Sequence, residues 1–111
     1  MDLSLSTRTV GERTILDVAG EVDVYSAPTL RDRIADLLES SEPSLVINLS
    51  DVSFLDSTGI GTLVAGLNRA VQLGGTLSLV CDHDRILKLF RITGLDAVFT
   101  IHPTVEDAID V

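Results

Sequence analysis

Hydrophobic and polar positions along this chain follow two periods, one typical of strands and one typical of helices. Residues 3–10 alternate apolar and polar side chains up to Gly11-Glu12, and residues 14–20 predict a second strand, so the two form a hairpin. Residues 44–49 are almost continuously apolar, as expected of a strand covered on both faces. We predict strands at Leu3–Val10, Thr14–Gly20, Ser44–Leu49, Leu77–Cys81 and Val98–Ile101, with a short segment, Asp51–Leu55, after the third.

Apolar residues at helical spacing predict helices between and after these strands. The first follows a turn at residues 21–25, with Ser26 as its N-cap and Pro28 in its first turn. The second ends at Gly74-Gly75, and the last has Thr104 and Asp107 spaced like a capping box. We predict helices at about Ala27–Ser40, Thr58–Leu73, Asp84–Thr93 and Thr104–Ile109.

The order of these elements predicts an α/β fold. Strands separated by helices indicate a largely parallel sheet, and the N-terminal hairpin adds an antiparallel strand at one side. With 111 residues the chain is expected to be one domain, residues 1–111, with a mixed β-sheet and flanking α-helices. The strand order is left open.

The charge balance narrows the function classes. The chain has 17 acidic and 8 basic residues, a net charge of -9, so its surface repels nucleic-acid phosphates and anionic lipid. Aromatic residues are only 4%, which argues further against stacking on single-stranded nucleic acid. We therefore expect neither a nucleic-acid partner nor a membrane partner.

Location follows from three further features. No apolar run approaches the length of a membrane span, and the first residues lack the pattern of a signal peptide. The single cysteine, Cys81, ends an apolar strand, so it is expected to be a small core residue without an internal disulfide. A cytoplasmic protein is expected, with no cofactor.

The most informative segment for function is Phe54 to Gly61, FLDSTGIG, which lies between a strand and a helix. It places Asp56, Ser57 and Thr58 at a helix N-terminus, where unpaired N–H groups and the helix dipole favour a phosphate group. A Ser or Thr at this point is also often only an N-cap, and Asp56 only a turn residue, and local physics leaves both interpretations open.

Two glycines follow in the first turn of that helix. Gly59 and Gly61 each cost up to about 1 kcal/mol relative to alanine. We expect both to keep side chains away, so that another backbone or a nucleotide phosphate can approach Ser57.

FLDSTGIG resembles the phosphoacceptor motif of bacterial anti-sigma factor antagonists, the STAS-domain regulators of sporulation and general stress. The resemblance extends through GEVDVYSAPTLRDRI, LVINLSDVSFLDSTGIG and ILKLFRITGLDAVFTIHPTVEDAI, and so covers nearly all of the chain. The opening MDLSLSTRTVGERT and the RITGL segment are similar to the actinobacterial developmental BldG type.

This resemblance implies a cycle of partner switching that regulates transcription. The unphosphorylated protein would bind an anti-sigma factor that is also a serine kinase of the GHKL type, and so free a sigma factor. The kinase would use ATP to phosphorylate Ser57, and a serine phosphatase would restore the binding form. Asp23 matches an acidic position of the family close to the acceptor.

We expect the partner to bind around this acceptor. Tyr25, the only tyrosine of the chain, is either an exposed anchor or packed on the first helix, and the sequence leaves both arrangements open. The expected partner-binding residues are Asp23, Val24, Tyr25, Asp56, Ser57, Thr58 and Gly59.

Enzymatic and nucleotide-binding functions fit the sequence less well. A nucleophile elbow needs glycine where Leu55 stands, and both His83 and His102 are expected to be solvated turn residues. A dinucleotide fingerprint needs glycine where Val64 stands, and no Walker lysine follows. We expect no catalytic residue.

A metal site is not predicted either. Asp82, His83 and Asp84 are adjacent and do not converge on a metal ion, so Asp82 is expected to be a helix cap. The function that competes most closely with the partner switch is a regulatory module of a larger assembly, built on the same fold.

Overall fold

The structure, a computed structural model, describes residues 2–40 and 44–109. Within these residues five strands form one sheet in the order β1-β2-β3-β4-β5. β1 is antiparallel to β2, and β2, β3, β4 and β5 are parallel to one another. The strands are β1 (Leu3–Val10), β2 (Arg13–Val22), β3 (Ser44–Leu55), β4 (Thr76–Val80) and β5 (Ile101–His102).

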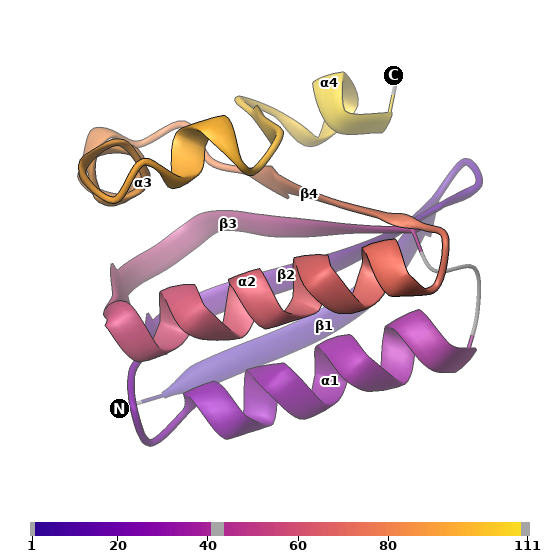
Figure 1. Ribbon diagram of the computed structural model, residues 1–111, viewed down its shortest axis with the longest axis horizontal. Helices are drawn as coiled ribbons and strands as arrows, with labels where there is room; N and C mark the ends of the chain where they lie inside the picture. Colours follow the sequence, from indigo (N-terminus) through magenta and orange to yellow (C-terminus); the bar gives the residue numbers. More distant parts are fainter. Residues whose placement is uncertain (1, 41–43, 110–111) are drawn as a thin grey trace.

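Helices cover the two faces of this sheet unequally. They are α1 (Ala27–Ser40), α2 (Ser57–Gln72), α3 (Asp84–Ile92) and α4 (Val105–Ile109), with a 3-10 helix η1 (Leu95–Ala97) after α3. α1 and α2 run side by side over the sheet (Figure 1), and together with α3 they bury the main core. α4 lies on the other face, where Ala108 packs in a smaller core with Ile15, Val46 and Val80.

The fold class agrees with the prediction, including the antiparallel strand at one side. The bounds of β1 and α1 are as predicted. Those of α2 and β4 differ by one residue at each end, and those of α3 and α4 by one residue at one end. In the part of the chain that the structure describes, no helix has the length and hydropathy needed to cross a membrane.

β2 and β3 are both longer than predicted. β3 continues through the segment 51–55, because its pairing with β2 extends from Thr14↔Leu45 to Val22↔Leu55. Register shifts after Asp17 and after Gly20 interrupt the alternation of buried and exposed positions, so the sequence pattern of this strand does not show its full length.

The predicted strand at Val98–Ile101 is wrong in its first part. Gly94 ends α3 in a left-handed conformation (φ 74°), and the chain turns through η1 before it reaches the sheet. Val98 is 54% exposed, whereas Phe99 is buried against Phe90 with ring centroids 5.7 Å apart at 85°. Burial of Phe99 therefore comes from this turn and not from strand pairing.

The predicted caps of α3 and α4 have different outcomes. The N-cap of α3 is His83, whose side chain makes no capping hydrogen bond, and Asp82 is exposed, so Asp82 is not the cap. At α4, the Asp107 amide donates to Thr104 Oγ1 at 3.1 Å, which forms one half of the predicted capping box.

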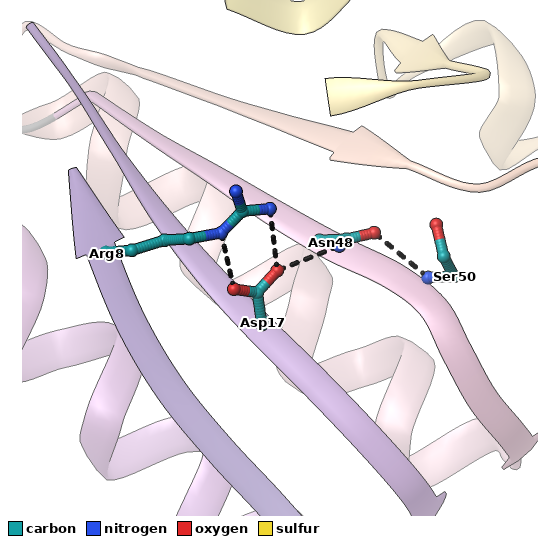
Figure 2. A network of polar contacts seen from close by, with 4 residues as sticks. All are labelled: Arg8, Asp17, Asn48 and Ser50. Carbon is teal, nitrogen blue, oxygen red and sulfur yellow. Dashed lines mark hydrogen bonds and ion pairs between the residues drawn. The ribbon is translucent and has the colours of Figure 1, made fainter. Parts of the chain in front are cut away.

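A polar network crosses three strands on the face opposite the main core (Figure 2). Arg8 Nε donates to Asp17 Oδ2 at 2.7 Å, and Asn48 Nδ2 donates to Asp17 Oδ1 at 2.8 Å. Asn48 Oδ1 in turn accepts a hydrogen bond from the Ser50 amide at 3.1 Å. Partial burial alone would raise the pKa of Asp17, but the hydrogen bonds from Arg8 and Asn48 and the charge of Arg8 together lower it.

Candidate functional site

The junction between β3 and α2, residues 54–61, is held to β2 by the backbone. Val22 and Leu55 are register partners at the ends of two parallel strands, and the Asp56 amide donates to Val22 O at 3.2 Å. Asp56 is the N-cap of α2: its Oδ1 accepts from the Gly59 amide at 2.9 Å, and its carbonyl accepts from the Ile60 amide at 2.9 Å. The capping role therefore belongs to Asp56, and not to Ser57 or Thr58.

Ser57 is the first residue of α2 and is exposed. Its hydroxyl makes no hydrogen bond with residues 2–40 or 44–109. The amides of Ser57 and Thr58 belong to the helix turn whose N–H groups have no intrahelical acceptor, and Asp56 already satisfies the next two amides. The junction thus presents a free hydroxyl beside unpaired donors at the positive end of a helix dipole.

The turn between β2 and α1, residues 23–26, lies at the same edge of the sheet. Asp23 Oδ1 accepts from the Tyr25 and Ser26 amides, both at 2.9 Å, and the Ser26 hydroxyl donates to Glu21 O at 2.8 Å. Ser26 Oγ also accepts from the Asp23 amide at 2.9 Å, so its side chain closes this turn and does not cap α1 as predicted. The hydrogen bond from the Ser26 amide, with that from the Tyr25 amide, lowers the pKa of the Asp23 carboxyl.

Large apolar side chains are exposed around these two segments. Tyr25 is 89% exposed and Val24 is 56% exposed, so Tyr25 does not pack on α1 and is an exposed side chain. Phe54, at the end of β3, is 46% exposed and is not among the partner-binding residues predicted from the sequence. Alternation along the strand could have predicted that Phe54 faces outward, because Leu55 beside it is buried. Residues 51–55 do not alternate regularly enough for that prediction.

The two glycines of the junction have different roles. A Cβ atom on Gly59 would lie 2.5 Å from Leu55 Cδ1 and 2.8 Å from Val22 Cγ1, whereas one on Gly61 would meet nothing within 4 Å. Gly59 is buried, so it allows α2 to pack closely on the sheet and does not clear space in front of Ser57 as expected. Gly61 is exposed and has free space beside it, so of the two glycines only Gly61 fits the expected role.

Neither histidine is hydrogen-bonded to the junction. His83 lies at the start of α3, and His102 lies in β5. Cys81 is buried as predicted, and its burial raises the pKa of its thiol. In the described ranges, no three His, Cys, Asp or Glu side chains are grouped as metal ligands would be. The geometry fits a site that is bound or modified by another protein.

Known proteins with a similar sequence lead to the same class of protein. Residues 4–108 match the family model of the STAS domain. The chain is 40% identical over 94 residues to the anti-sigma-B factor antagonist of Bacillus subtilis (strain 168). These residues make up 85% of each chain. The chain therefore belongs to the STAS domain family.

Solved structures agree with this assignment. An anti-sigma factor antagonist from Mycobacterium paratuberculosis has a TM-score of 0.90 and 30% identity, and the match covers 98% of this chain and 92% of that one. The Bacillus cell fate determinant SpoIIAA in its phosphorylated form has a TM-score of 0.73 and 23% identity, covering 96% and 97%, and so supports the fold alone. The STAS-like α/β fold predicted from the sequence is confirmed, and the relatives agree with the predicted class of function.

Proposed function

We propose that this chain is an anti-sigma factor antagonist that works by partner switching, with Ser57 as its phosphorylation site. Without phosphate it binds an anti-sigma factor, a serine kinase of the GHKL type, and so releases a sigma factor. Phosphorylation by that kinase ends the binding, and a serine phosphatase reverses it. The observation that carries the proposal is the exposed hydroxyl of Ser57, free of hydrogen bonds to the described residues at the first position of α2.

The same position explains how phosphate can be accommodated in the free protein. A phosphoserine adds about -1.5 to -2 charges, and the amides of Ser57 and Thr58 can donate to its oxygens. Asp56 already caps the helix through its own carboxylate, so the phosphate does not have to displace an existing hydrogen bond of the serine. Phosphorylation is therefore expected to leave the fold intact.

In a complex, the same charge becomes unfavourable. The junction already carries the carboxylate of Asp56, and Asp23 lies on the neighbouring turn. A partner pressed against this edge would force the phosphate to lose water beside two carboxylates. A hundredfold loss of affinity requires only about 2.7 kcal/mol, which such a placement can supply.

The proposed partner-binding surface combines apolar anchors with this switch. Tyr25 and Val24 offer exposed apolar area at the edge of the sheet where Ser57 lies, and Phe54 adds to it from β3. Gly59 is buried, so it contributes through the close packing that positions its neighbours. The proposed set is Asp23, Val24, Tyr25, Asp56, Ser57, Thr58 and Gly59, with Phe54 added.

We also propose that the chain belongs to the BldG-type branch of the family and acts in the cytoplasm without catalytic activity of its own. The first part rests on the similarity of residues 1–14 and 91–95 to that type. The cytoplasmic location rests on the composition of the chain. The lack of catalytic activity rests on the absence of any hydrogen bond between Ser57 and a histidine in the described part of the chain.

The direct test is intact-mass analysis after incubation with an anti-sigma kinase and ATP. We expect the gain of one phosphoryl group, mapped to Ser57, in the wild type and in Thr58→Ala, and no gain in Ser57→Ala. Thr58→Ala is the matched control because Thr58 is the next hydroxyl along the helix and is also exposed. Phosphate on Thr58 would keep the mechanism and move the site, and no phosphorylation by any such kinase would refute the proposal.

A further inference from the structure

The cations of this acidic chain are distributed unevenly. Of its 8 basic residues, three lie on the nine residues of α3: Arg85, Lys88 and Arg91. The helix has one acidic residue, Asp84, at its N-terminal end. α3 is thus a cationic segment in a chain whose net charge is -9.

These cations are not used within the described part of the chain. Arg8, Arg31 and Arg69 each form an ion pair with a carboxylate, whereas in residues 2–40 and 44–109 no carboxylate oxygen lies within 4.0 Å of the charged nitrogens of Arg85, Lys88 or Arg91. Their side chains also make no hydrogen bond there. Acidic residues number 17 against 8 basic ones, so the lack of pairing is not caused by a shortage of partners.

The cations share the outer surface of α3 with an exposed apolar residue. Arg85, Lys88 and Ile92 are spaced at i, i+3 and i+7, which places them on one face, and Arg91 neighbours Lys88 at i, i+3. Ile92 is 71% exposed, whereas Ile86 and Phe90 on the apolar face of α3 are fully buried. Ile92 adds exposed apolar area at the end of this row of cations.

We propose that this outer surface of α3, formed by Arg85, Lys88, Arg91 and Ile92, is a second docking surface that binds an acidic segment of a protein partner with an apolar anchor. Opposite charge would supply the attraction to the three cations, and the anchor would cover Ile92. The surface is separate from the Ser57 switch and goes beyond the proposed function. Figure 1 shows α3 and the beginning of α2 at the same end of the sheet, so one partner could contact both.

Phosphorylation should leave this surface unchanged. The added charge lies at the start of α2, and α3 offers the opposite sign of charge. A phosphatase must bind the phosphorylated form. An acidic segment of such a partner could bind α3 without being repelled by the phosphate. This consequence alone rests on the proposed function.

The experiment is an NMR titration of the ¹⁵N-labelled protein with a synthetic peptide of Glu and Asp that carries leucine at helical spacing. We expect shifts on residues 84–92 that weaken as salt is added. Arg85→Gln/Lys88→Gln should reduce the affinity by about tenfold, the sum of two exposed charge contacts. The control Arg31→Gln/Arg33→Gln removes the same charge from α1 and should reduce it by less than about twofold.

Two further comparisons separate the contributions. Ile92→Ser should weaken binding of the peptide. Val71→Ser changes a residue of α2 that is 64% exposed, and it should leave binding of the peptide unchanged. Ser57→Asp should bind the peptide as the wild type does, so the result does not depend on whether Ser57 is phosphorylated by a kinase. Absence of shifts on α3, equal loss in the control variant, or stronger binding of a lysine-rich peptide or duplex DNA would each overturn the proposal.

Discussion

The β3–α2 junction and the polar network on the sheet use similar side chains in opposite ways. In the network, Asp17 accepts from both Arg8 and Asn48, and Asn48 accepts from the Ser50 amide. At the junction, Asp56 satisfies two amides of α2, but the hydroxyl of Ser57 is left without a partner among the described residues.

The difference follows from position. Asp17 is partly buried on the face of the sheet opposite the main core, where a carboxylate without hydrogen bonds would be costly. Ser57 lies at an exposed helix end, where water satisfies the hydroxyl at no cost to folding. In this protein, polar groups that stabilise the sheet are paired, and the group proposed to carry the switch is free to react.

The largest expected effect concerns binding. Full phosphorylation of Ser57 should weaken the complex with the anti-sigma kinase by about a hundredfold, and Ser57→Asp, with less charge, by about tenfold or more. Ser57→Ala should bind as the wild type does. Isothermal titration calorimetry measures all three.

Ser50→Asp is the matched control, because Ser50 is also exposed and lies on β3. It adds the same charge at the network and should leave kinase binding unchanged. An equal loss in Ser50→Asp would mean that total charge, and not the position of Ser57, controls the complex.

The next effect concerns the packing beneath the junction. Gly59→Ala should lower the free energy of unfolding by about 1–3 kcal/mol, since its methyl group would overlap Leu55 and Val22. Gly61→Ala meets no atom within 4 Å and should raise that free energy by up to about 1 kcal/mol through helix propensity. Urea denaturation compares the two, and similar losses in both variants would contradict the assigned packing.

Disruption of the network should affect stability and not binding. Asp17→Ala leaves Arg8 and Asn48 without their acceptor and should lower the free energy of unfolding by about 1–2 kcal/mol. Asp51→Ala removes the same charge at an exposed position of β3 and should leave the free energy of unfolding nearly unchanged. If Asp17→Ala weakened kinase binding as strongly as Ser57→Asp, the two regions would not be independent.

The smallest expected effect is the pH dependence of the stability that the network contributes. The pKa of Asp17 is lower in the folded chain than in the unfolded chain, so its ionised form stabilises the fold above the unfolded pKa, about 4. This contribution is lost as the pH falls through the lowered folded pKa. The difference in unfolding free energy between the wild type and Asp17→Ala should therefore shrink as the pH falls below about 4, and a difference that grows would have the wrong sign.

The sequence by itself determined much of this protein. Alternation along β1 and helical spacing along α1 predicted both elements to their observed ends, because each has one face on a single core. The strand–helix junction at Ser57 was also predictable, since FLDSTGIG separates an extended segment from an amphipathic one. The α/β class and the family follow from the same local information.

Only the tertiary structure decided the details that depend on neighbouring elements. The last part of β3 exists because it pairs with β2 across register shifts, and residues 95–99 form a turn that brings Phe99 against Phe90. Gly59 is required by side chains of Leu55 and Val22, and exposure of Tyr25 depends on the turn that Asp23 closes. Contacts between residues far apart in the chain leave no periodic pattern in the sequence, so these features could be seen only once the elements were packed together.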